Sequence, residues 1–107
     1  MWALRYNLEI QGSLDPIPLR EFGDTIMNNP MYGDIVAALK ERPGFVQKTA
    51  AVTETQNRCF AITELVFDTK ENFDLYITDP STISLWDLFE IFAAESGMTV
   101  QKEIVEI

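Results

Sequence analysis

The side chains of this sequence that could do chemistry are aromatic rings, amides, guanidinium groups and carboxylates, because the usual catalytic groups are missing. The chain contains no histidine and one cysteine, Cys59. Without histidine there is no proton shuttle with a pKa near neutrality, no histidine ligand for zinc or haem, and no Ser-His or Cys-His nucleophile. One cysteine excludes an internal disulfide, and a lone strand cysteine, even beside Arg58, is usually an inert small hydrophobic residue. We therefore predict that the protein uses no cofactor.

Four aromatic residues could line an apolar pocket between a helix and a sheet. An aromatic ligand could stack there, and a tyrosine would offer it a hydroxyl. The alternative, which is the more common case, is that aromatic residues at helical or strand spacing simply fill the core. Amide and guanidinium groups could point into the same pocket. The candidate lining residues are Tyr6, Phe22, Trp86 and Phe89, and the candidate polar groups are Asn7, Arg58 and Asn72.

A run of carboxylates raises the question of a Mg²⁺ or Ca²⁺ site. Asp68, Glu71 and Asp74 recur every three residues near a predicted helix start, and Asp87 and Glu90 follow on the next helix. Hard cations accept such ligands, but no loop supplies the carbonyl groups and fixed spacing of a dedicated site. Acidic side chains in a first helical turn also complement the helix dipole. We interpret the cluster as a solvated face and predict no metal site.

Length and charge limit the classes of protein to which the chain could belong. With 107 residues, 47% of them hydrophobic and 11% aromatic, it can bury one core, so we predict a single domain over residues 1–107. The net charge of −9 repels nucleic-acid phosphates and anionic lipids. There is no apolar run of membrane-spanning length and no basic, then apolar, leader. We expect an acidic cytoplasmic protein without nucleic-acid or membrane partners.

Hydrophobic periodicity predicts four strands and two broken helices. The first strand, near residues 2–10, alternates strictly, with Asn7 on its more polar face. Helical spacing follows in each half of the chain, and Pro30 and Pro80 each break a helix into two pieces. Ser84 is expected to cap the last piece. The remaining strands are predicted near residues 45–53, 58–67 and 99–107.

A weak internal duplication supports this order of elements. Phe22 and Gly44 in the first half correspond to Phe73 and Gly97 in the second, and each half contains a strand, a broken helix, a glycine and a strand. Two such halves predict an α+β, ferredoxin-like β-α-β-β-α-β sandwich, a four-stranded antiparallel sheet with the helices on one face. The other face would carry polar and apolar side chains together, among them Phe45, Gln47, Thr49 and Ala51 of the second strand. We predict a homodimer through the sheet faces, because two-fold self-association is the commonest solution for soluble proteins.

Three parts of the sequence carry a resemblance to a known superfamily. They are the opening alternating strand, the helix end and strand entry Leu-Lys-Glu-Arg-Pro-Gly-Phe at residues 39–45, and the strand-to-helix passage at residues 67–76. Together they resemble the dimeric α+β barrel superfamily, which includes the antibiotic-biosynthesis monooxygenase-like proteins and many small proteins without known function. The resemblance implies two sheets packed face to face in a dimer, with a small, often aromatic, ligand between the sheet and helices of each subunit.

Two functional hypotheses remain. The haem-binding relatives and those with a His-Asp pair need histidine, which this chain lacks. The resemblance therefore leaves a cofactor-independent monooxygenase or isomerase acting on a small aromatic or enolic substrate. The other hypothesis, which we favour, is a protein that binds a small apolar or aromatic ligand or acts as an assembly module, because the sequence alone identifies no group with a shifted pKa. A regulatory amino-acid-binding domain has the same element order and a similar Gly12, but shorter helices.

Overall fold

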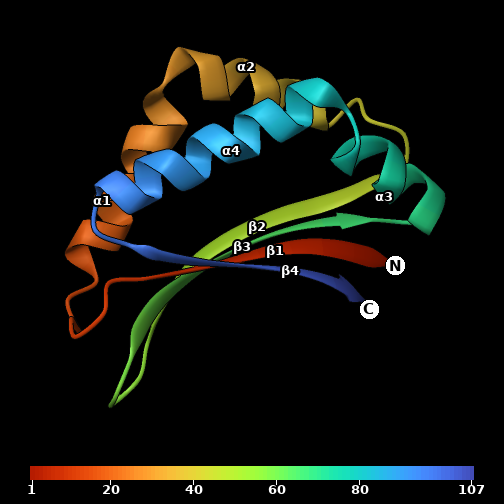
Figure 1. Ribbon diagram of the computed structural model, residues 1–107. Coiled ribbons are helices and arrows are strands. Elements are labelled where there is room, and N and C mark those ends of the chain that lie inside the picture. The colour runs from red at the N-terminus through yellow and green to blue at the C-terminus, as the bar shows by residue number, and fades with distance from the viewer.

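The chain folds into strands and helices in the order β-α-α-β-β-α-α-β. The computed structural model describes residues 1–107, apart from the side chains of Met31 and Ile35. None of the helices so described is both long and apolar enough to cross a membrane. The elements, shown in Figure 1, are β1 (Trp2–Glu9), α1 (Ile17–Asn28), α2 (Pro30–Leu39), β2 (Phe45–Glu54), β3 (Cys59–Phe67), α3 (Lys70–Ile77), α4 (Pro80–Glu95) and β4 (Thr99–Glu106).

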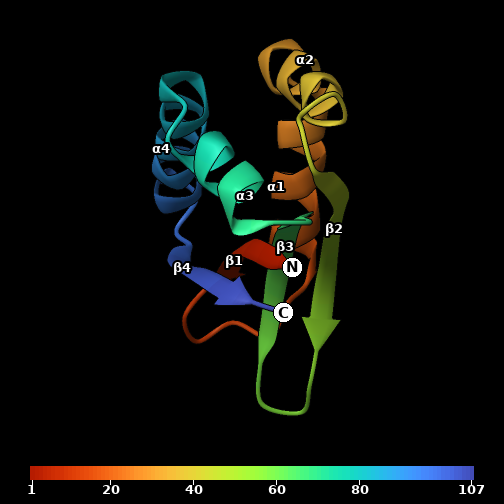
Figure 2. The ribbon, with the colours of Figure 1, turned by 90° about the vertical axis from the view of Figure 1, so that its right-hand side faces the viewer.

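The four strands form one antiparallel sheet in the order β2-β3-β1-β4. Its central strands, β1 and β3, pair without interruption from Trp2 opposite Phe67 to Glu9 opposite Phe60. The helices cover one face of the sheet and leave the other face bare (Figure 1). In Figure 2, α1 and α2 lie over the β2 side of the sheet and α4 over the β4 side. This architecture confirms the predicted ferredoxin-like α+β fold.

The two prolines divide the helices where the sequence predicted. Pro30 begins α2 directly after α1, and Pro80 begins α4. The carboxylate of Asp79 caps α4 by accepting a hydrogen bond of 2.8 Å from the backbone N–H of Ser81. Ser84 lies inside this helix, so the expectation that it forms the cap is wrong, because Asp79 and a proline in the first turn already make a complete helix start. Each observed strand boundary differs from the predicted one by at most one residue.

Gly44 joins the entry of β2 to the start of α3. Its φ of +75° lies in the left-handed region that glycine adopts without strain. The carbonyl oxygen of Gly44 accepts a hydrogen bond of 2.9 Å from the backbone N–H of Asp68. A Cβ at this position would collide with Oδ1 of Asp68 and lie 2.5 Å from Nδ2 of Asn72. The close approach of the two segments therefore requires glycine.

The hydrophobic core lies between the sheet and the helices. On β1, Leu4, Tyr6 and Leu8 face the helices and are at most 3% exposed. Burial of such apolar area is the main favourable contribution to folding, at about 25 cal/mol for each Å². The buried cluster is completed by Leu19, Phe22, Tyr32, Leu39, Cys59, Leu65, Phe67, Phe73, Tyr76, Leu85, Phe89, Ala93 and Met98.

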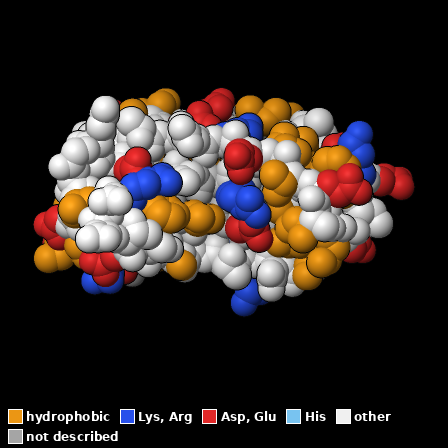
Figure 3. Space-filling model, turned by 90° about the horizontal axis from the view of Figure 1, so that it is seen from below, with side chains coloured by type: hydrophobic (Ala, Val, Ile, Leu, Met, Phe, Trp, Pro, Cys, Tyr) orange, Lys and Arg blue, Asp and Glu red, His pale blue; other side chains and the backbone are white. Residues whose placement is uncertain are grey.

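The bare face of the sheet carries ion pairs among apolar side chains. Arg5 on β1 forms an ion pair of 2.7 Å with Glu64 on the neighbouring strand β3. Arg58 pairs with Glu9 at 2.8 Å, and its guanidinium group lies 4.5 Å from the centre of the Phe60 ring. Figure 3 shows this side of the molecule, with both charge signs in its middle and hydrophobic side chains around them. The mixed character predicted for this face is therefore present.

Candidate functional site

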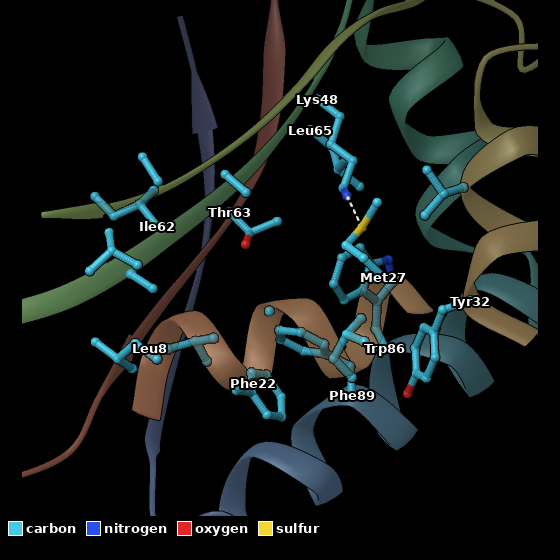
Figure 4. Close-up of a pocket in the computed structure, with 18 of the residues that line it drawn as sticks. Leu8, Phe22, Met27, Tyr32, Lys48, Ile62, Thr63, Leu65, Trp86 and Phe89 are labelled. Atoms are coloured by element: carbon cyan, nitrogen blue, oxygen red, sulfur yellow. Dashed lines mark hydrogen bonds between the residues drawn. The ribbon is translucent and has the colours of Figure 1, made fainter. Parts of the chain in front are cut away.

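A cavity of about 200 Å³ lies between the sheet and the helices. It lies between β1, β2 and β3 on one side and the helices on the other, as the close-up in Figure 4 shows. Most of its lining side chains are apolar or aromatic. The labelled ones are Leu8, Phe22, Met27, Tyr32, Lys48, Ile62, Thr63, Leu65, Trp86 and Phe89.

Lys48 brings an amine to this apolar cavity. Its side chain extends from β2 toward α1, where Nζ lies 3.8 Å from the sulfur atom of Met27 (Figure 4). Burial lowers the pKa of the Lys48 amine below its ordinary value, because loss of water disfavours the ammonium form. In the part of the chain that the structure describes, the amine makes no ion pair with a carboxylate. A half-buried amine of this kind can bind an anion, or can accept a proton from a bound ligand.

Two tyrosine hydroxyl groups also belong to residues that line the cavity. The Tyr32 hydroxyl is buried and, among the described residues, has no hydrogen-bond partner. Burial raises the pKa of Tyr32, which therefore remains a neutral hydroxyl at physiological pH. The Tyr76 oxygen accepts a hydrogen bond of 3.0 Å from Nε1 of Trp86. Burial raises the pKa of Tyr76 as well, although the bond from Trp86 opposes the shift. Two residues that line the cavity thus carry neutral hydroxyl groups, in addition to the amine of Lys48.

Three of the four predicted aromatic residues line this cavity, namely Phe22, Trp86 and Phe89. Tyr6 lies behind them, with its ring stacked on Trp86 at 4.8 Å between centres and 18° between planes. The Tyr6 hydroxyl donates a hydrogen bond of 3.1 Å to Glu90. Burial is the main cause that raises the pKa of Tyr6, and the nearby Glu90 carboxylate raises it further. Tyr6 therefore supports the cavity wall from behind, and its hydroxyl already has a partner.

The three predicted polar residues lie away from this cavity. Asn7 is on the bare face of the sheet, because it alternates with the inward-facing residues of β1. Arg58, at the end of the β2–β3 turn, is held by Glu9 on that same face. Asn72 lies in the first turn of α3 and donates a hydrogen bond of 2.9 Å to Asp68. The structure thus brings Phe22, Trp86 and Phe89 together and places Asn7, Arg58 and Asn72 in other environments.

Sequence reasoning missed Lys48. The strand from residue 45 to 53 was predicted, with Phe45, Gln47, Thr49 and Ala51 facing away from the helices, but Lys48 was not named as a candidate residue. In the structure Lys48 pairs with Leu65 of β3, a core residue, so both side chains point toward the helices. A lysine on the inward-facing side of a strand is the signal that could have identified this group.

The other candidate groups have simple structural surroundings. Asp68 accepts the bond from Asn72, which lowers the pKa of its carboxyl. Cys59 is buried, and burial raises the pKa of its thiol, so the thiolate is disfavoured. Over the side chains that the structure describes, no group of three or more potential ligands converges as in a metal site. These residues are therefore weaker candidates for a site than the cavity.

Comparison with known proteins finds no matching family model and no matching curated protein, whereas solved structures match over almost the whole chain. A dimeric ferredoxin-like protein from an uncultured marine organism is 10% identical, with a TM-score of 0.68 over 99% of this chain and 94% of its own. A monooxygenase from Streptomyces coelicolor, solved in complex with nanaomycin D, is 9% identical, with a TM-score of 0.60 over 99% and 88%. A variant of SnoaB, a cofactor-independent oxygenase from Streptomyces nogalater, is 15% identical, with a TM-score of 0.58 over 99% and 91%.

These similarities confirm the predicted resemblance at the level of the fold. The chain has the ferredoxin-like architecture shared by dimeric ferredoxin-like proteins and monooxygenases of this group. Sequence identities of 15% or less accompany the shared fold. Because one fold serves many functions, the shared fold alone does not define the function of this chain.

Proposed function

We propose that the chain is a homodimeric binding protein, with one ferredoxin-like domain over residues 1–107, whose cavity holds a small apolar or aromatic ligand. The observation that carries the proposal is the cavity of about 200 Å³ between sheet and helices, with an amine on its wall. Ligand sites in proteins are typically apolar hollows of roughly 300 to 1,000 Å³ with a few polar groups that orient the ligand. The smaller volume favours a ligand with a single ring.

The homodimer is supported by the bare face of the sheet. That face combines the Arg5–Glu64 ion pair with the partly buried ring of Phe60. Two copies could cover each other's apolar area there, and a similar solved structure is described as a dimeric ferredoxin-like protein. A stable dimer of this kind should bury more than about 1,200 Å².

A cofactor-independent monooxygenase or isomerase is the second candidate, and Lys48 favours it. A lysine with a lowered pKa is a more effective base at physiological pH than an ordinary lysine, because more of its amine is unprotonated. Its Nζ could take the proton of a phenol or enol, which would leave an anionic ligand beside the newly formed ammonium. An isomerase would then return the same proton to another atom of the substrate, and Lys48 would become a neutral amine again.

Titration with a panel of one-ring phenols and enols, followed by tryptophan fluorescence and thermal unfolding, tests the binding proposal. Trp86 lines the cavity and should report the ligand, and a ligand at 100 times its dissociation constant should stabilise the fold by about 2.7 kcal/mol. Ala61→Leu should fill part of the cavity and weaken binding, whereas Trp2→Phe should leave the fluorescence change intact. No response to any compound at millimolar concentration would contradict the proposal. Oxygen uptake or product formation would favour the catalytic alternative.

A further inference from the structure

We infer that the ligand of this cavity is a small organic monoanion, with an apolar ring and one carboxylate or enolate group that pairs with Lys48. The inference rests on the proposed binding function and names the class of ligand. It depends on three features of the site: the sign of the charges around the cavity, the state of the Lys48 amine, and the apolar nature of the remaining wall.

The charge around the cavity has the opposite sign to that of the chain. The sequence has seventeen acidic residues and eight lysine or arginine residues, for a net charge of −9. The described side chains that line the cavity nevertheless include two cations, Arg20 and Lys48, and no aspartate or glutamate. A cavity that is locally cationic in an acidic protein favours entry of an anion over a cation.

The Lys48 ammonium lacks the partner that the other half-buried cations have. Arg5 lies 2.7 Å from Glu64, and Arg42 lies 2.6 Å from Asp79. The amine of Lys48 has only the weak acceptor sulfur of Met27, at 3.8 Å, among the side chains that the structure describes. A charged group that is removed from water without a counter-ion is costly. A ligand carboxylate would supply the missing counter-ion, and the same contact would shift the pKa of Lys48 back toward its ordinary value.

Arg20 extends the cationic character to the exposed side of the cavity. It is on α1, and its guanidinium group forms only a long ion pair of 3.5 Å with Glu54 at the end of β2. Both of these side chains are more than half exposed. Because exposed ion pairs of this length contribute little to stability, the pair can open at small cost when an anion approaches. Arg20 would then steer the anion toward Lys48.

The rest of the wall selects an apolar body for the anion. Phe22, Trp86 and Phe89 come from two helices and surround the space opposite Lys48 (Figure 4). Aromatic rings pack well against another ring in stacked or edge-on contacts. A ligand with a second charged group would have to bury that group against these rings without a partner, which is costly. The site therefore fits one anionic group and one apolar ring.

Isothermal titration calorimetry with matched pairs of ligands tests the inference. Benzoate and benzamide have the same shape and differ in charge, as do cyclohexanecarboxylate and cyclohexanecarboxamide. We expect the anion of at least one pair to bind more tightly than its amide by about tenfold or more. Lys48→Met should remove this preference, and Lys48→Arg should retain part of it. Lys102→Met, which changes an exposed lysine outside the cavity, should have no effect.

The outcomes separate this inference from the binding proposal. If the amides bind as tightly as the anions, or if Lys48→Met keeps the preference, the anion inference is wrong and the binding proposal stands. If neither member of either pair binds at millimolar concentration to a chain that is folded by circular dichroism, the anion inference is wrong, and the binding proposal also fails if the panel of phenols and enols gives no response. Circular dichroism and thermal unfolding of each variant establish that a lost preference reflects the amine and not a lost fold.

Discussion

The amine of Lys48 lies 3.8 Å from the sulfur of Met27, so one contact joins the edge strand β2 to helix α1 beside the cavity. Nothing in the described surroundings neutralises this amine through an ion pair. A half-buried charge without a counter-ion is a feature that folding alone does not favour. Removal of this charge should therefore stabilise the folded chain.

Lys48→Met should increase the free energy of unfolding near neutral pH by about 1 kcal/mol, because it replaces a half-buried cation with an apolar side chain of similar length. Lys48 has a lower pKa in the folded chain than its ordinary value of 10.5. The unfolded chain therefore binds more protons at intermediate pH, and the stability of the wild type should rise as pH increases through that interval. Urea unfolding from neutral pH to pH 10.5 should show the advantage of the variant shrinking toward zero. A constant difference, or a loss of stability in Lys48→Met, would contradict this assignment.

Gly44→Ala should destabilise the fold by about 2 to 4 kcal/mol, because the new Cβ meets two side chains and the residue keeps a positive φ. Gly12→Ala is the matched control. Gly12 has a φ of +79°, but a Cβ there would meet nothing within 4 Å. Gly12→Ala should therefore cost only the backbone strain, about 1 to 2 kcal/mol. Equal decreases in the melting temperatures of the two variants would mean that the overlap of the new Cβ with Asp68 and Asn72 does not contribute to the loss of stability.

Tyr6→Phe should lower the free energy of unfolding by about 1 kcal/mol, because it leaves Glu90 without the hydrogen bond that Tyr6 donates. The ring stack on Trp86 would remain, and Tyr6 does not line the cavity. Affinity for a cavity ligand should therefore change little, whereas Trp86→Ala should reduce it strongly. Calorimetric titration of both variants makes the comparison. A large loss of affinity in Tyr6→Phe would give the Tyr6 hydroxyl a direct part in binding.

Asn7→Arg should dissociate the proposed homodimer. Asn7 lies on the bare face, between Ile62 of β3 and Gln101 of β4. In a face-to-face dimer each copy would bury a new, unpaired cation, which costs several kcal/mol. Sedimentation velocity should show a dimer for the wild type and a monomer for the variant. Asp34→Arg, an exposed change on α2, should stay dimeric. A monomeric wild type at micromolar concentration would refute the dimer itself.

The sequence predicted the fold well because its signals are local. Strict alternation from residue 2 to 9 defines β1, and Pro30 and Pro80 set the helix breaks at positions that proline tolerates. Aromatic residues at helical spacing also predicted that Phe22 and Phe89 face the sheet. Here the local pattern and the tertiary packing agree.

The orientation of the side chains of β2 depends on strand register. The prediction that Phe45 faces away from the helices is wrong, because Phe45 packs against the core, whereas simple alternation from Phe45 would place Gln47 inward and Lys48 outward. An irregularity between Phe45 and Gln47 shifts the pattern and turns Lys48 toward the helices. Alternation predicted that Asn7 lies on the bare face of the sheet. It did not predict that the cavity lies on the opposite side of the sheet, away from Asn7. The expected absence of a nucleic-acid partner and the cytoplasmic location stay predictions from charge and composition.

Diffraction from crystals soaked with para-bromophenol would show whether the cavity is the ligand site, because the anomalous signal of bromine locates a one-ring ligand without prior assumptions. We expect a bromine peak in the cavity, near Phe22, Trp86 and Phe89, with the phenol oxygen within hydrogen-bond distance of Nζ of Lys48. The peak should be absent in crystals of Ala61→Leu. A cavity without bromine, with peaks only on the bare face of the sheet or between molecules, would contradict the claim that this cavity is the ligand site.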